Sequence, residues 1–109
     1  SYTAQQSGTW EFRNAPSGTA EATATFTTRL QIDASGHLTP GSNNSQDLGS
    51  SSLRWANLYT NDLNLSNKGS TNSVDGTWGS YTIQEGENDL FLINKRNGKK
   101  YKFNLTEVS

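Results

Sequence analysis

The sequence predicts an all-β chain, and three features support this. Residues 20–33 alternate between small or apolar side chains and polar ones, which is the period of a strand with one packed and one solvated face. An Asn97-Gly98 pair lies between two apolar runs, which is typical of a β-hairpin. The remaining residues are dominated by Ser, Thr, Asn and Gly, which indicates short strands joined by turns.

The first half contains two clear strand patterns. Residues 9–13 alternate, with Trp10 and Phe12 on one side, and a turn over residues 14–18 separates them from the long alternating run. We expect Phe26, Leu30 and Ile32 to share the packed face of that run. Asp33-Ala34-Ser35-Gly36 then predicts a turn, with Gly where a positive φ is needed. Residues 38–45 have the composition of a polar loop.

The middle of the chain predicts a short helical turn between strand-rich regions. The Ser cluster at residues 50–52 is suited to cap a short helical turn, which would bury Trp55 and seat Tyr59, with Arg54 pairing a nearby acid. Leu63 and Leu65 alternate in a short strand, and residues 66–76 lack periodicity and predict a loop. We place a module boundary there, which gives a first β module over residues 1–66 and a second over 67–109.

The last third predicts a three-stranded meander. Its strands are expected over residues 78–85, 90–95 and 99–105. A two-residue turn at Asn97-Gly98 would place Lys95 opposite Lys100 and put the apolar side chains of the last two strands on one face. The expected pairs are Leu90 with Leu105, Leu92 with Phe103, and Asn94 with Tyr101.

The composition predicts a thin core and therefore a partner. Only 30% of the residues are hydrophobic, yet 10% are aromatic and the net charge is −1, which argues for a folded chain rather than a disordered one. Cysteine is absent, so disulfides cannot support a small core. The small side chains of Ala20, Ala22 and Ala24 would let another backbone approach closely. We therefore expect a homotrimer, intertwined or side by side.

Two segments resemble phage virion appendages. Residues 30–38, Pro40 and the stretch Asp-Leu-Gly-Ser-Ser-Ser-Leu-Arg-Trp at 47–55, followed by Asn57-Leu58-Tyr59, resemble the shafts of phage tail fibres. Residues 76–86 and 99–103 are similar to the terminal module of virion structural proteins from marine phages. The resemblance implies a parallel homotrimer with other virion proteins as partners, a location in the virion, a fibre-shaft-like module over 1–66 and a role in host attachment. It does not extend to a self-cleaving chaperone domain.

Few residues suggest catalysis or cofactor binding, so we predict that the chain is not an enzyme and holds no cofactor. One His and no Cys exclude Cys/His catalysis and zinc motifs. His37 follows a turn, where we expect it to face solvent, with a shared ion on a trimer axis as the less favoured alternative. Glu85, Glu87 and Asp89 surround Gly86 but lack the spacing of an EF-hand, and solvated turn acids are the favoured interpretation. We therefore predict no metal site.

Charge and hydropathy exclude two partners. A pI of about 5.7 argues against broad nucleic-acid binding, and no apolar run approaches the length of a membrane span. The chain opens at Ser1 without an initiator Met, which indicates a fragment or a processed product.

One basic cluster is a candidate contact with anionic surfaces. Five of the nine basic residues lie near the expected hairpin end, where a solvated charge block is favoured over a patch for acidic bacterial glycans. Trp10, Trp55 and Trp78 are expected to pack rather than to stack on sugars. The basic cluster consists of Lys95, Arg96, Lys99, Lys100 and Lys102.

The alternative to a virion appendage is a monomeric carbohydrate-binding domain.

Overall fold

The computed structural model describes residues 2–6, 8–16 and 25–109 of the chain. These residues form β-strands, turns and irregular segments without a helix, which confirms the all-β class. The chain divides into two units, Ser1–Trp55 and Ala56–Ser109, and each unit holds one four-stranded antiparallel sheet. Within the described residues there is accordingly no helix that is long and apolar enough to cross a membrane.

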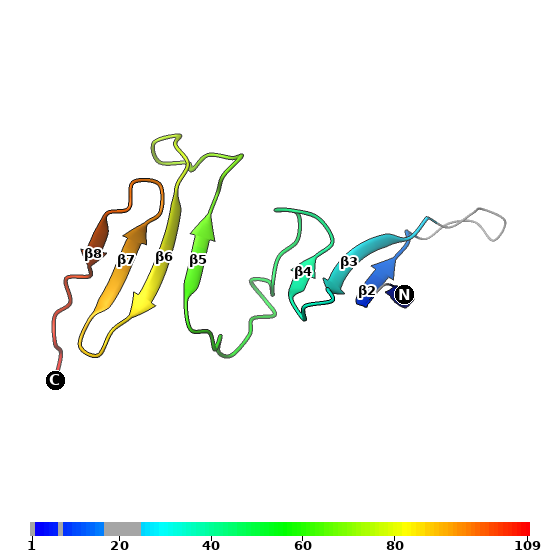
Figure 1. The fold of residues 1–109 in the computed structure, drawn as a ribbon, viewed down its shortest axis with the longest axis horizontal. Helices are drawn as coiled ribbons and strands as arrows, with labels where there is room; N and C mark the ends of the chain where they lie inside the picture. The colour runs from blue at the N-terminus through cyan, green and yellow to red at the C-terminus, as the bar shows by residue number, and fades with distance from the viewer. Residues whose placement is uncertain (1, 7, 17–24) are drawn as a thin grey trace. The chain divides into compact units, whose positions relative to one another are not determined.

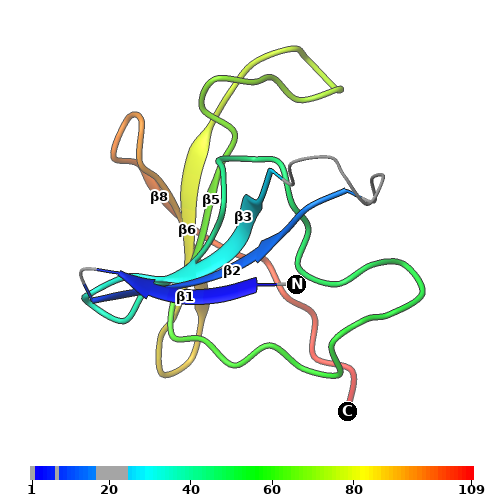
Figure 2. The same cartoon turned by 90° about the vertical axis from the view of Figure 1, so that its right-hand side faces the viewer.

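The first sheet has the order β1-β2-β3-β4. Figure 2 shows three of its strands side by side: β1 (Tyr2–Gln6), β2 (Thr9–Asn14) and β3 (Thr27–Ile32). The fourth, β4 (Leu38–Pro40), is short and pairs with the end of β3. The strand predicted over residues 9–13 is confirmed, and so is the part of the long alternating run that β3 covers. Residues 17 and 18 of the predicted turn at 14–18, and the whole small-residue face at residues 20–24, lie outside the described residues.

A register shift between Phe12 and Arg13 breaks the simple alternation that the sequence predicted for β3. Phe12 pairs with Leu30, but the next residue, Arg13, pairs with Thr28, so β3 carries one extra residue at Arg29. Such a bulge bends a strand and leaves the extra residue without a cross-strand partner. Leu30 and Ile32 keep a common apolar face, whereas Thr28 lies opposite Arg13.

The turn between β3 and β4 forms as predicted because Asp33 organises it. Its carboxylate accepts the N–H groups of Ser35 (2.9 Å) and His37 (2.9 Å), and its carbonyl accepts that of Gly36 (2.9 Å). Gly36 has a φ of 87°, which favours glycine. The polar loop predicted from residue 38 is wrong for its first three residues, which form β4, an edge strand that tolerates Pro40.

The predicted helical turn near Trp55 is wrong. Residues 51–59 are irregular, Trp55 is 69% exposed, and Arg54 makes no ion pair within the described part of the chain. The reason lies at Ser50, whose N–H donates to the Leu53 carbonyl (2.9 Å) while its hydroxyl accepts the Leu53 N–H (3.0 Å). This reciprocal pair runs against the helical direction and closes a tight loop instead.

The second sheet has the order β5-β6-β7-β8 and forms a continuous meander after β5 (Figure 1). Its strands are β5 (Leu63–Ser66), β6 (Ser80–Glu85), β7 (Leu90–Asn94) and β8 (Lys100–Lys102). The predicted strands at 63–65 and in the meander are thus present, with the meander strands shorter than expected. The proposed boundary after residue 66 separates β5 from its partner β6, whereas the contacts divide the chain after Trp55.

The predicted pairing of the last hairpin is wrong by two residues. Leu92 pairs with Tyr101 rather than Phe103, Ile93 pairs with Lys100, and Lys95 lies in the loop instead of opposite Lys100. A four-residue loop forms because the Asn94 carboxamide accepts the Arg96 N–H (3.0 Å) and the Asn94 carbonyl accepts the Gly98 N–H (2.8 Å). Lys95 also donates its N–H to the Ser80 carbonyl (2.8 Å), which keeps it on β6.

A slip of two residues preserves the face on which each side chain lies. The expected common face of Leu90, Leu92, Tyr101 and Phe103 therefore survives the change of register, since the Phe103 N–H donates to the Leu90 carbonyl (3.0 Å). Leu105, expected opposite Leu90, lies beyond the last strand.

We expect Gly41→Ala to destabilise the first unit by about 1–3 kcal/mol, as overpacking does in a filled site. A Cβ at Gly41 would lie 1.8 Å from the Thr28 carbonyl oxygen, so β4 would have to move away from β3. Thermal unfolding followed by circular dichroism measures the change, with exposed Ser42→Ala as the control. Equal melting temperatures for the two variants would contradict the tight approach of these strands.

Candidate functional site

One face of the first sheet is apolar and exposed. Cross-strand partners point to the same side of a sheet, so the pairing Trp10–Ile32–Leu38 forms one row and Phe12–Leu30–Pro40 forms the next. Trp10 is 46% and Leu38 61% exposed. The alternate residues of β2, including Glu11 and Arg13, are the half-buried ones, and these two form an ion pair. The sheet thus presents its apolar side outward.

The second sheet repeats this arrangement. Leu63, Ile83, Leu92 and Tyr101 are aligned across all four strands, and a second row continues from Leu65 to Tyr81. Leu65 is 50% exposed, and the other members are half-buried or exposed. The apolar face comprises Leu63, Leu65, Tyr81, Ile83, Leu90, Leu92, Tyr101 and Phe103.

The opposite face of the second sheet is polar toward β5 and apolar toward β8. The Thr82 hydroxyl donates to Asn64 (2.7 Å), which also accepts the Lys95 ammonium (3.2 Å). Thr82 is 5% exposed and is the only buried residue among those that the structure describes. Phe91 and Ile93 lie on the same face near β8.

The described residues therefore contain no buried apolar side chain. The chain exposes 9626 Å², whereas a compact protein of 11.9 kDa exposes about 6,000 Å². Two separate compact bodies of half that mass would expose about 7,200 Å² together by the same scaling. An excess of about 2,400 Å² is comparable to the area that one chain buries in an obligate oligomer, about 1,000–2,500 Å².

The irregular segment at residues 48–59 adds further apolar surface. Large side chains there are at least two-thirds exposed, and Tyr59 reaches 90%. Three of these side chains belong to the first unit and two to the second, and each leaves apolar surface open to contact with another protein. The exposed members are Leu48, Leu53, Trp55, Leu58 and Tyr59.

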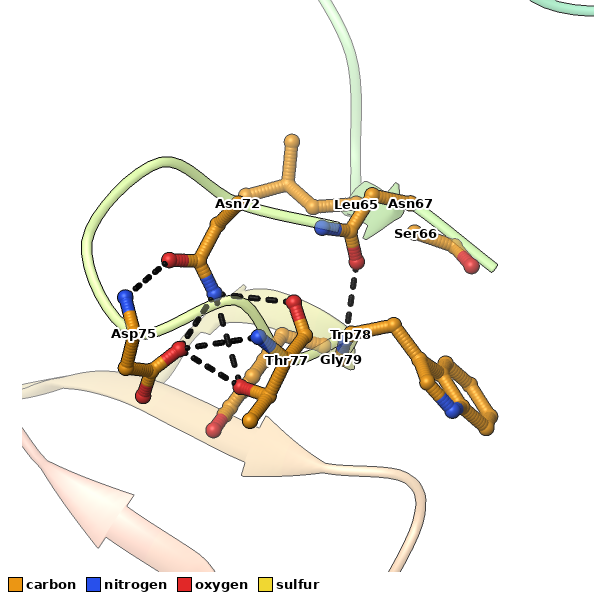
Figure 3. A pocket seen from close by; sticks show the side chains of 9 residues that line it. Leu65, Ser66, Asn67, Asn72, Asp75, Thr77, Trp78 and Gly79 are labelled. Atoms are coloured by element: carbon orange, nitrogen blue, oxygen red, sulfur yellow. Dashed lines mark hydrogen bonds between the residues drawn. The ribbon is translucent and has the colours of Figure 1, made fainter. Parts of the chain in front are cut away.

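A hollow of about 480 Å³ lies beside the loop between β5 and β6 (Figure 3). Asn72 organises its rim, since its carboxamide oxygen accepts the N–H groups of Val74 (2.8 Å) and Asp75 (2.9 Å) and its NH₂ donates to the Thr77 carbonyl (2.9 Å). Asn67 closes the other side by accepting the Gly79 N–H (2.7 Å). The sequence predicted a loop over residues 66–76, and the signal for its internal order is the spacing of Asn72, Asp75 and Thr77.

The polar atoms of this hollow are largely used within the loop. The Thr77 hydroxyl donates to Asp75 (2.7 Å), and this bond, followed by the one from Asn72, lowers the pKa of the Asp75 carboxyl below its usual value. The Trp78 ring is covered on one side by the Arg96 guanidinium, 3.8 Å from its centre. An aromatic ring and satisfied polar groups fit a rigid loop better than a sugar site, which needs unpaired donors and acceptors.

The five basic residues do not form one patch. Arg96 stacks on Trp78 and donates to its carbonyl (3.1 Å), and Lys95 binds Asn64. Lys100 and Lys102 lie on the face of Ile93 and Phe91, whereas Lys99 pairs with Asn94 and lies on the other face. A single flat anionic partner therefore meets at most some of them at once.

The candidate ion sites of the sequence remain apart in the structure. His37 is exposed, as expected of a turn residue, and its ring nitrogen lies 3.8 Å from Asp33. The backbone N–H of His37 is the main cause of the lowered pKa of Asp33. Among the described residues no three His or acidic side chains are grouped as metal ligands, and this includes Glu85, Glu87 and Asp89.

The chain matches no protein-family model, no curated protein and no solved structure.

We expect Thr77→Val to raise the pKa of Asp75 toward its ordinary value, because the main hydrogen bond to the carboxylate is lost. A lowered pKa means that the loop is stabilised above the ordinary pKa of an aspartate and loses that support as the pH falls through the folded-state value. An NMR titration of the carboxyl group measures the shift, with Thr60→Val as the control, since Thr60 donates to a backbone carbonyl. An unchanged titration curve would refute the role of Thr77.

Proposed function

We propose that this chain is a structural module of a phage tail fibre or similar virion appendage, that it acts without catalysis, and that it works as a homotrimer. One observation carries the proposal: two sheets each present an apolar face that spans at least three strands, and no apolar side chain of the described residues is buried. Folding is driven mainly by burial of apolar surface. A single copy lacks that burial, so further protein surface is required.

The composition of these faces favours other copies of the same chain as the protein surface that covers them. Both faces are broad rows of Leu, Ile, Phe, Tyr and Trp side chains rather than enclosed cavities, and obligate homo-oligomer interfaces have this apolar composition. Three copies related by a rotation form a closed ring in which every face meets a neighbour. The resemblance of residues 30–59 to fibre shafts favours three copies over two, and it favours other virion proteins as partners.

Attachment to the host surface is the secondary role that we propose. Acidic glycans are the ligand that suits the basic hairpin residues, and a trimer would present each of them three times.

We expect sedimentation equilibrium to give three times the 11.9 kDa chain mass at micromolar concentration. Leu38→Gln and Leu65→Gln should lower that mass, because each removes an apolar side chain that an interface would bury, at a cost of about 1.5–3 kcal/mol per chain. In a monomer these half-exposed side chains would contribute little to the free energy of folding.

The matched control is Val74→Gln, which changes an apolar side chain that is 94% exposed on the loop between β5 and β6 and belongs to neither apolar face. This variant should keep the mass of the unaltered chain. A stably folded monomer would overturn the proposal and favour the alternative, an autonomous carbohydrate-binding domain.

A further inference from the structure

A second, smaller hollow of about 380 Å³ lies on the mixed face of the second sheet, beside β8. Its floor is apolar and consists of Phe91 and Ile93, and Lys100 and Lys102 flank it along the open edge of β8. Gln84 from β6 and Tyr101 from β8 complete the lining. We call this site the β8 hollow. It suits a short segment that carries apolar side chains and a negative charge.

Residues 104–109 have these properties. They follow β8 as an irregular segment in which every residue is exposed, including Leu105 and Val108, and Glu107 lies between these two. Hydrogen bonding to the sheet is last seen at Phe103, whose N–H donates to Leu90. Figure 1 shows the segment continuing past the end of β8.

The direction of the segment argues against docking on its own sheet. β8 runs antiparallel to β7, from the partner of Ile93 toward the partner of Phe91. The segment therefore leaves the sheet beyond the β8 hollow, and no turn after Lys102 brings it back. A neighbouring copy supplies the hollow without such a reversal.

We propose that residues 104–109 of one copy dock in the β8 hollow of the next, with Leu105 and Val108 against Phe91 and Ile93 and with Glu107 facing Lys100 and Lys102. This exchange rests on the proposed oligomer and adds a specific contact to it. Charge complementarity sets the register of the segment, while the apolar contacts supply most of the stabilisation. Lys100 and Lys102 would then serve assembly rather than a glycan.

Cysteine cross-linking tests the contact directly, because the natural chain has no Cys to give background. Chains with Lys102→Cys and chains with Val108→Cys, distinguished by a mass tag, are refolded together and oxidised. We expect a disulfide between the two kinds of chain, at least about tenfold above a Lys102→Cys and Val74→Cys mixture, because docking holds the pair at millimolar effective concentration. Glu107→Lys should lower the yield, and adding Lys100→Glu should restore it.

The outcomes separate this inference from the proposed oligomer. A trimeric mass without the cross-link would overturn the docking and leave the oligomer standing, whereas a monomeric mass would overturn both. A disulfide within single chains that carry both substitutions would show docking on the same copy and would also overturn it. Heparin binding that Lys100→Glu/Lys102→Glu abolishes, in a chain that fails to cross-link, would assign the β8 hollow to acidic glycans instead.

Discussion

Each sheet of this protein is a single layer, and covering its apolar face is the constraint on which the rest of the structure depends. A domain normally packs a sheet against a second layer. Here the faces around Trp10 and around Ile83 have no such layer among the described residues of their own units. Each unit resembles half of a sandwich. The missing half has to come from outside it, which is why assembly and folding belong together in the proposed function.

Because packing within each unit is weak, the turns and loops of the chain are fixed mainly by short polar side chains. Asp33, Ser50, Asn72 and Asn94 each bind backbone groups a few residues away and thereby fix a turn or loop. Such bonds work without a core, since they need only local geometry. The abundance of Ser, Thr, Asn and Gly, which first suggested a poor core, therefore also explains how the chain is ordered without one.

Local contacts also hold most of the basic side chains near the last hairpin. The basic residues are distributed between a ring contact at Trp78, a hydrogen bond to Asn64 and the edge of β8. Lysines on an edge strand discourage unspecific pairing with other sheets. In the proposed docking, Leu105, Glu107 and Val108 of a neighbouring copy would offset this effect by contacting the lysines and the apolar floor beside them.

The sequence was sufficient to predict the all-β class, the turn at Asp33 and the faces of the last hairpin, because alternation, Asx turns and Gly positions are local properties. It did not predict the register of that hairpin, since a slip of two residues keeps every side chain on its face, and the observed register goes with the four-residue loop that the Asn94 hydrogen bonds close. Nor did it predict β4, which exists because β3 offers a free edge to Leu38–Pro40. Trp55 shows the same limit: its sequence suggested burial, but Ser50 closes a loop that leaves the ring exposed. The outward display of both apolar faces was likewise decided by the tertiary structure, because periodicity marks which side chains share a face and leaves open whether that face is covered by the same unit.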